Sequence, residues 1–376
     1  MKITPFRATY AYFHHIPSPD GFCESVKFQF QEYVQTGALE KFPHPAFYIY
    51  QIEDRKHRRN IGLVALDAVE DFLAGQVKMH EKTLREKEEQ QMELFLRWNA
   101  ILKPVLLTHP PVPVLDEWLN TFARQHKPLF VTRFAKSGQV HRIWAVSDPA
   151  EIGQLQALFA EHVPSAYIAD GHHRTTTVAL LHERYQQQQP QDYDFDHLFC
   201  AFFSTDQLDI LDYNRVVEAP AGLSPLQLMV QLSRLFDIEP LSEAQKPTQK
   251  HALTLLLRKE WFRLHWRKEV LEQHADQTVV LDTSLLNELV LRDLLGITDV
   301  RTDQRITYIE GSKGLKGIQK VVGNGTNRLG FVLYPVSFDD LQQLADAGES
   351  MPPKSTYFEP RMRSGVLVKS LLREEK

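Results

Sequence analysis

The chain has 376 residues, 43% of them hydrophobic and 24% charged, and its 43 Lys and Arg against 48 Asp and Glu give a formal net charge of −5. This composition is typical of a globular protein with a substantial core, and it lacks the basic excess of many nucleic-acid-binding proteins. DNA is therefore disfavoured as a partner.

The two cysteines and the N-terminus indicate the compartment. Cys23 and Cys200 are isolated, which excludes a disulfide framework and a CxxC metal pair and favours a reducing environment. The N-terminal residues lack the apolar stretch of a signal peptide, and no later run approaches the ~18 apolar residues of a membrane helix. We therefore expect a cytoplasmic protein.

Strand and helix patterns alternate through the first part of the chain. Aromatic and β-branched runs at 46–51 and 62–66 flank a charged loop and predict a β-hairpin. A long helix is predicted from 81 to 98, where Glu, Lys, Gln, Leu and Arg follow one another with almost no helix breaker. The same criteria predict, in order, strand 104–107, helix 115–125, strand 129–132, helix 152–162, strand 166–169, a helix ending near 188 and strand 197–203.

The Ala-Pro-Ala segment at 219–221 marks an internal boundary. It divides the chain into an N-terminal α/β portion, 1–218, and a C-terminal α+β portion, 222–376, which form either two domains or one. The elements predicted beyond it are helices 224–235, 283–295 and 339–347 and strands 261–266 and 330–335. The Gly-rich run 311–317 lacks the Gly-Lys-Ser/Thr ending of a phosphate loop and predicts a glycine turn into a helix. We expect an α/β or α+β fold, with helices around a mixed β-sheet.

The first candidate site is the run Asp170-Gly171-His172-His173-Arg174, between a predicted strand and a predicted helix. A glycine turn at a helix start exposes backbone N–H groups where the helix dipole favours an anion, and Arg174 adds a fork of donors for phosphate. Asp170 is a candidate Mg²⁺ ligand or an orienting group for a histidine. His172 is a candidate proton donor, and His173 a candidate phosphate contact.

Thr175 and Thr176 add hydroxyl groups to this helix start and are further candidate phosphate ligands. The alternative is a helix capped by Asp170 whose histidines only pack or face solvent. Adjacent histidines also occur at His14 and His15, so the pair by itself does not decide between these interpretations.

The second candidate site is His80-Glu81-Lys82-Thr83, which combines an acid/base group, a carboxylate, a cation and a hydroxyl. It is not a zinc-protease motif, because Leu84 stands where the second histidine would be. The alternative is an exposed helical turn without chemistry.

The third candidate is Lys354-Ser355-Thr356, which follows two prolines and offers a cation and two hydroxyls to a phosphate. The alternative here is a solvated loop. We predict that the second and third motifs converge on the cleft that contains Asp170 and Gly171.

With these three motifs, the chain resembles the domain-of-unknown-function family 1015 over nearly its whole length. The motifs read Tyr-Ile-Ala-Asp-Gly-His-His-Arg (167–174), His-Glu-Lys-Thr (80–83) and Met-Pro-Pro-Lys-Ser-Thr-Tyr-Phe-Glu-Pro (351–360). The strand–turn–helix unit is more remotely similar to the phosphate-binding element of the ParB/sulfiredoxin superfamily, which includes DNA-partition proteins, sulfiredoxins and free-serine kinases. This second resemblance is an analogy at the level of the fold.

The sequence differs from members of that superfamily in ways that argue against some of their functions. His172 stands where a sulfiredoxin needs a cysteine, and neither a helix-turn-helix nor a basic face for DNA partition is recognisable. Phosphoryl transfer on a small hydroxylated metabolite remains, with serine or phosphoserine preferred and the kinase or phosphatase direction open. The implied cofactors are Mg²⁺, held by Asp170, and ATP or ADP.

The roles expected in that reaction follow from the residue types. Arg174, Lys82 and Lys354 bind and stabilise the phosphate, and Glu81 or His80 acts as base or acid. The alternative function is a nucleotide-binding regulatory module, or a DNA-linked one, in which the same groups bind without catalysis.

Overall fold

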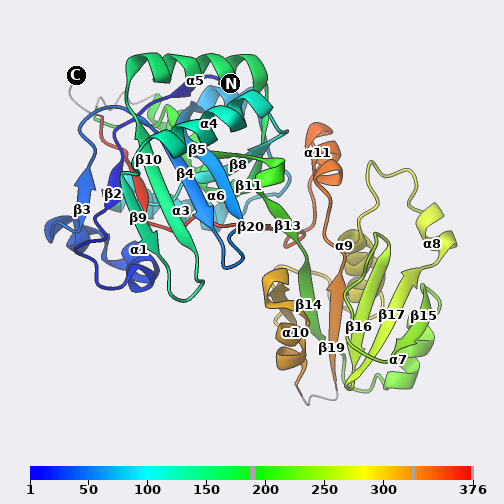
Figure 1. Cartoon of the computed structure of the whole chain (residues 1–376). Helices are drawn as coiled ribbons and strands as arrows, with labels where there is room; N and C mark the ends of the chain where they lie inside the picture. Colours follow the sequence, from blue (N-terminus) through cyan, green and yellow to red (C-terminus); the bar gives the residue numbers. More distant parts are fainter. Residues whose placement is uncertain (187–191, 324–326, 374–376) are drawn as a thin grey trace. The chain divides into compact units, whose positions relative to one another are not determined.

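The computed structural model describes residues 1–186, 192–323 and 327–373, and these form two compact units (Figure 1). Unit 1 comprises Met1–Met79, Thr83–Asp209 and Pro360–Lys376. Unit 2 comprises His80–Lys82 and Ile210–Glu359. The first three residues of the His-Glu-Lys-Thr motif, 80–82, thus belong to unit 2, although the residues directly before and after them belong to unit 1.

Unit 1 is built on a mixed sheet. Its order is β6-β11-β8-β12-β5-β4-β10-β9, with β1 paired to β5. The β8–β12 and β6–β11 pairs are parallel and the others antiparallel, so the predicted mixed α/β fold is confirmed. Its strands are β1 (Ile3–Thr4), β4 (Phe47–Glu53), β5 (Arg59–Ala68), β6 (Val77–Lys78), β8 (Val105–His109), β9 (Phe130–Arg133), β10 (Val140–Val146), β11 (Ala166–Asp170) and β12 (His197–Ser204).

The burial of this sheet explains why its strands form. β12 is buried at all but its first residue, and it lies between β5 and β8 as a continuous apolar run should. The predicted hairpin is confirmed as β4 and β5, paired antiparallel from Tyr48–Val64 to Glu53–Arg59.

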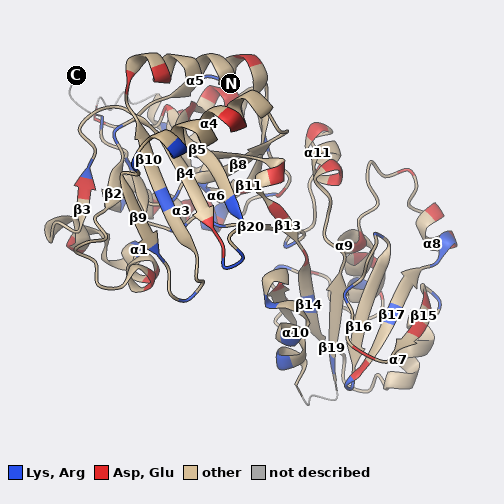
Figure 2. Cartoon of the chain, in the orientation of Figure 1, with Lys and Arg blue, Asp and Glu red and all other residues tan. Residues whose placement is uncertain are grey.

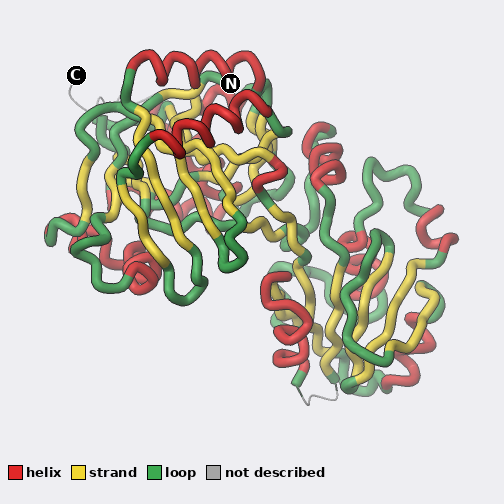
Figure 3. The backbone as a smooth tube through the Cα atoms, in the orientation of Figure 1, coloured by secondary structure: helices red, strands yellow, loops and turns green. Residues whose placement is uncertain are grey.

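Helices and a smaller sheet complete unit 1 (Figure 3). The smaller sheet has the order β3-β2-β21-β7, so its β21 comes from the end of the chain. Its strands are β2 (Thr9–Ala11), β3 (Leu39–Lys41), β7 (Ala100–Ile101) and β21 (Leu367–Ser370). The helices are α1 (Pro19–Gln35), α2 (Val69–Leu73), α3 (Arg85–Trp98), α4 (Pro113–Gln125), α5 (Pro149–His162), α6 (His172–Gln186) and the short η1 (Thr205–Gln207).

Unit 2 contains an antiparallel sheet of order β15-β17-β16-β19-β14-β18. Val217 packs with α7 (Pro225–Leu232) and η2 (Leu286–Arg292) in one apolar cluster, whereas its neighbour Val216 packs with α10 (Gly314–Val322) in another, because successive strand residues point to opposite faces. The sheet strands are β14 (Tyr213–Glu218), β15 (Phe236–Leu241), β16 (Ala252–Leu257), β17 (Glu260–Trp266), β18 (Ile306–Glu310) and β19 (Arg328–Leu333).

The remaining elements are short. β13 (Asp209–Leu211) pairs with β20 (Tyr357–Glu359). The helices of unit 2 are α7 (Pro225–Leu232), α8 (Lys268–Glu272), α9 (Asp282–Leu285), η2 (Leu286–Arg292), η3 (Gly311–Lys313), α10 (Gly314–Val322) and α11 (Phe338–Asp346). The Gly-rich run 311–317 is the predicted turn into a helix, formed by η3 and α10.

Neither charge sign is confined to one unit, since Figure 2 shows basic and acidic segments in both. Within residues 1–186, 192–323 and 327–373, no helix combines the length and apolar character that crossing a membrane requires.

Candidate functional site

The first motif forms a strand, a glycine turn and a helix. β11 ends at Asp170, Gly171 adopts φ +116, and α6 begins at His172. A Cβ atom on Gly171 would lie 2.7 Å from Nη2 of Arg174, so the turn needs glycine both for its backbone conformation and for this contact. Thr175 N donates to Gly171 O at 3.0 Å, and the N–H groups before it are the ones a helix leaves without intrahelical acceptors.

Three cations surround the carboxylate of Asp170. Its Oδ2 accepts hydrogen bonds from Lys103 Nζ and Arg174 Nη2, both at 2.9 Å, and Arg361 Nη2 lies 3.8 Å from its Oδ1. The side chains of Lys103, Asp170 and Arg174 are each about four-fifths buried. Three positive charges therefore approach one carboxylate at the start of α6, where the helix dipole also favours negative charge.

The cations keep Asp170 ionised. Burial raises its pKa, but the charges of Lys103, Arg174 and Arg361 outweigh burial and hold the pKa well below its ordinary value. Burial lowers the pKa of Lys103, and the charge of Asp170 opposes that shift.

This environment does not fit a Mg²⁺ ligand. Two cationic donors already occupy Oδ2 of Asp170, and a divalent ion would meet three positive charges there. No group of three or more His, Cys, Asp and Glu side chains in the described chain could hold a metal. The expectation that Asp170 holds Mg²⁺ is therefore disfavoured by the charge of its surroundings.

We predict that Gly171→Ala displaces the guanidinium of Arg174 and weakens anion binding at this turn. The added methyl group meets Nη2 at 2.7 Å, and the positive φ costs about 1–2 kcal/mol of folding free energy. Gly75→Ala is the control, since Gly75 has φ +80 but nothing within 4 Å of its Cβ position. Calorimetric titration with phosphate should show weaker binding for Gly171→Ala alone, and equal affinity in both variants would contradict the prediction.

The other predicted residues of this motif differ in accessibility. His172 is 6% exposed, and Thr175 is fully buried with its Oγ1 donating to Gly171 O at 3.3 Å. His173 Nε2 accepts the N–H of Leu84 at 3.2 Å, which requires a lone pair on that nitrogen. Thr176 Oγ1 is buried without a hydrogen-bond partner in the described chain. Their roles as proton donor or phosphate ligands stay predictions.

The second and third motifs meet in unit 2. His80 O accepts the N–H of Met351 at 2.8 Å, and His80 Nε2 lies 3.4 Å from Thr356 Oγ1. The two segments are far apart in the sequence, and this pairing explains why residues 80–82 belong to unit 2. The predicted convergence of both motifs on Asp170 stays a prediction.

The histidine and the acid of the second motif have different environments. His80 is 2% exposed, and burial lowers its pKa to about 4, so it is neutral and a weak base at pH 7. Glu81 is half-buried and Lys82 is exposed. The helix predicted from residue 81 begins only at Arg85, because Glu81 lies in a bend, residues 82–84 form no regular structure and Leu84 has extended backbone angles. The helix boundary was thus wrong by four residues.

In the Lys354 loop, the lysine is exposed and the hydroxyl of the next residue is buried. Lys354 is exposed with φ +59, and its Nζ lies 5.3 Å from the ring centre of Tyr213. Ser355 is 5% exposed, and its Oγ lies 2.7 Å from Pro352 O and 3.2 Å from Thr283 Oγ1. The Ser355 hydroxyl therefore stabilises the loop, and Lys354 is the group of this pair that solvent reaches.

Sequence reasoning missed Lys103 and Arg361. Lys103 lies just before β8, which pairs antiparallel with β11. The register of this pair, with its shift between Ile168 and Asp170, determines how close the start of β8 lies to Asp170. The signal for Arg361 was its place immediately after the third motif. Neither residue has a distinctive local pattern, so only the strand pairing and the chain path identify them.

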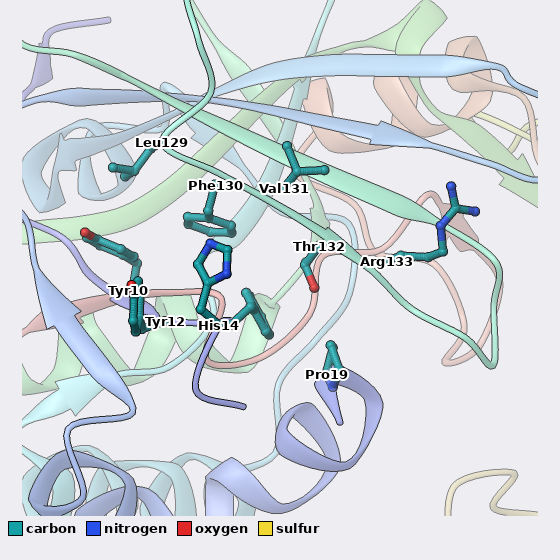
Figure 4. Close-up of a pocket in the computed structure, with 10 residues that line it drawn as sticks. Tyr10, Tyr12, His14, Pro19, Leu129, Phe130, Val131, Thr132 and Arg133 are labelled. Atoms are coloured by element: carbon teal, nitrogen blue, oxygen red, sulfur yellow. The ribbon is translucent and has the colours of Figure 1, made fainter. Parts of the chain in front are cut away.

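A separate pocket of about 280 Å³ lies in unit 1, and Figure 4 shows its lining side chains. Tyr10 and Phe130 stack there with ring centres 5.7 Å apart. None of the predicted site residues lines it. The lining comprises Tyr10, Tyr12, Phe13, His14, Pro19, Leu129, Phe130, Val131, Thr132 and Arg133.

Comparison with known proteins gives a family and distant structural similarity. The model of a family described as "Protein of unknown function (DUF1015)" matches residues 11–284. No curated protein matches the chain.

Solved structures resemble the chain only weakly. SbnI with a C-terminal truncation, from Staphylococcus aureus, is 11% identical with a TM-score of 0.44, over 81% of this chain and 85% of that one. A free serine kinase in complex with AMP is 13% identical with a TM-score of 0.39, over 78% and 86%. A conserved hypothetical protein from Pyrococcus furiosus is 13% identical with a TM-score of 0.36, over 78% and 90%. Scores this low assign no reaction to the chain.

Proposed function

The chain belongs to the DUF1015 family, whose description assigns no reaction, and from the geometry we propose that it transfers a phosphoryl group to or from a small hydroxylated metabolite. Serine or phosphoserine is the preferred substrate, and a nucleotide such as ATP or ADP is the preferred phosphoryl donor or acceptor. The observation that carries the proposal is the group of cationic side chains held around Asp170 at the Gly171 turn.

The binding role belongs to unit 1. Only Nη2 of the Arg174 guanidinium has hydrogen-bond partners among the described residues, so further donors of this side chain remain for a ligand. Asp170 holds Lys103 and Arg174 in place, which reduces the ordering cost when an anion binds. Cations fixed before the reaction are what phosphoryl transfer requires, because its catalysis rests on positioning and on stabilising phosphate charge.

The proton-transfer role is assigned to Glu81 of unit 2. A carboxylate orients the attacking hydroxyl or water in many phosphoryl transfers, and the lowered pKa of His80 makes the histidine the weaker candidate at neutral pH. Kinase and phosphatase directions would use the same groups. No step is assigned to a metal at Asp170.

The test is incubation of the full chain with ATP or ADP, Mg²⁺ and serine, and separately with phosphoserine, followed by analysis of phosphate and products. Transfer in either direction supports the proposal. Nucleotide binding without turnover of any substrate would instead favour the non-catalytic regulatory module, and we propose a cytoplasmic location for either function.

We predict that Arg174→Ala lowers the affinity for phosphate by about 1.5–3 kcal/mol, because the variant loses a charge-assisted, partly buried donor. Arg184→Ala on the same helix is the control, since Arg184 contacts Met92 Sδ rather than the Asp170 group. Isothermal calorimetry measures both variants. An unchanged affinity in Arg174→Ala would remove this residue from the site.

A further inference from the structure

Arg215 is a fully buried arginine without a carboxylate partner in the described part of the chain. It lies in β14, where it pairs with Tyr308 of β18 and Phe331 of β19, and its exposed fraction is 0%. Buried guanidinium groups are normally paired with an acid, because an isolated buried charge costs several kcal/mol.

The contacts of Arg215 are two carbonyls and an aromatic ring. Nη1 donates to Tyr213 O at 2.6 Å and Nη2 to Lys354 O at 3.3 Å, while the guanidinium lies 5.4 Å from the ring centre of Tyr308. Its Nε is buried and has no hydrogen-bond partner among the described residues. Burial lowers the pKa of Arg215 to about 10, which still leaves the side chain positively charged at pH 7.

The charge of Arg215 therefore lies directly beneath the Lys354 loop. Lys354 forms no ion pair with any described residue, and its Nζ is held over the Tyr213 ring. Two positive charges, one buried and one exposed, thus act on the same loop, and no acid within the described ranges forms an ion pair with either of them. A neutral donor could satisfy the two carbonyls at a lower desolvation cost, so hydrogen bonding alone does not account for the charge.

We propose that the Lys354 loop is an anion-binding subsite of unit 2, in which Lys354 contacts the anion and Arg215 is a positioning residue that holds the loop and supplies a buried positive charge. The low polarisability of the surroundings lets the charge of Arg215 act on a bound anion without touching it. The ligand is a phosphate group, and this identity rests on the proposed function.

The test uses pyrophosphate as the probe and Lys354 as the reporter. The full chain is labelled with acetic anhydride at increasing pyrophosphate concentrations, and acetylation of Lys354 is measured by mass spectrometry of its peptide. Bound pyrophosphate should protect Lys354 in the wild type. In Arg215→Met the half-protecting concentration should rise about tenfold, as expected for losing a poorly screened charge near the anion.

Two further variants separate charge from loop packing. Arg215→Lys keeps the charge and should stay within about threefold of the wild type. Thr283→Val removes the Thr283–Ser355 hydrogen bond from the same loop without changing any charge, and it should leave the half-protecting concentration nearly unchanged. Thermal melts check that Arg215→Met, Arg215→Lys and Thr283→Val are all folded at the labelling temperature.

The outcomes distinguish this subsite from the proposed reaction. Equal protection in Arg215→Met and wild type, an equal loss in Thr283→Val and Arg215→Met, or an unprotected wild-type Lys354 would each overturn the subsite. If wild type shows protection that Arg215→Met loses but transfers no phosphoryl group, the subsite stands and the reaction is wrong. If wild type transfers phosphoryl groups and Arg215→Met is protected normally, the reaction stands and the role of Arg215 is wrong.

Discussion

Replacing Glu81 with Gln is expected to lower kcat for phosphoryl transfer by about 10²–10⁴ with little change in KM. The substitution keeps the size of the side chain and most of its hydrogen bonding but removes its ability to take a proton. A group that acts only in the transition state affects kcat and kcat/KM together, so the expected signature is a selective loss of turnover. Steady-state kinetics with serine and phosphoserine measures it.

Two variants test whether the loss belongs to Glu81. Glu86→Gln makes the same chemical change at an exposed position of α3 and should leave kcat unchanged. His80→Ala removes the competing base, which the lowered pKa of about 4 makes the weaker candidate. If Glu81→Gln turns over at the wild-type rate while His80→Ala is inactive, the base is His80.

The second large effect concerns a buried acid in unit 1. Asp67 of β5 is 0% exposed, and neither of its oxygens receives a hydrogen bond from a described donor. Burial and, to a smaller extent, the nearby carboxylate of Asp71 together raise its pKa to about 8, against the opposing charge of the N-terminal ammonium. Oδ2 of Asp71 is also buried and has no partner among the described residues, so a proton held by Asp67 can be donated to it.

The free energy of unfolding should therefore fall as the pH rises from about 4 to about 8. The folded state keeps the Asp67 proton through this range, whereas the unfolded chain loses it near pH 4, so each unit of pH costs up to about 1.4 kcal/mol. This loss of unfolding free energy is absent below the pKa that Asp67 has in the unfolded chain, and it is complete above the pKa that Asp67 has in the folded protein. Asp67→Asn should remove this dependence and be the more stable form at pH 8. Urea unfolding at a series of pH values, followed by hydrogen exchange in β5 and β12, measures both effects.

A control for general charge effects is Glu161→Gln on α5, where the side chain is 74% exposed. It should shift the unfolding free energy little at any pH in this range. A slope in Asp67→Asn as steep as in the wild type would show that Asp67 is not the titrating group.

Local sequence patterns were sufficient to predict the strands that are buried on both faces. The runs that became β4, β5 and β12 are apolar almost throughout, so no partner had to be known to identify them as strands. The helix start at residue 81 was wrong because Glu and Lys favour a helix locally, whereas contacts with the Met351–Thr356 segment hold the preceding residue, His80, and no helix forms before Arg85. The helix predicted at 283–295 contains the π-helical turn η2, a distortion that hydrophobic spacing does not reveal.

Some residues of the candidate site could likewise be predicted from local sequence, and others could not. The Asp170–Arg174 turn could be predicted because glycine, a helix start and arginine are adjacent in the sequence. Lys103 and Arg361 could not, because their proximity to Asp170 depends on a strand register and on the path of the chain after residue 359. Arg215 matters because it is buried and no acid in the described part of the chain pairs with it, which only three-dimensional packing can establish.

The discontinuity of unit 1 has a consequence for synthesis of the protein. Its strand β21 pairs with β2 and β7, and its Arg361 approaches Asp170, yet both are translated after the whole of the Ile210–Glu359 segment. At a translation rate of about 5–20 residues per second, the early part of unit 1 waits many seconds on the ribosome with the β2 and β7 edges uncovered. Exposed strand edges invite mispairing, so nascent chains should be most dependent on chaperones between emergence of residue 209 and release.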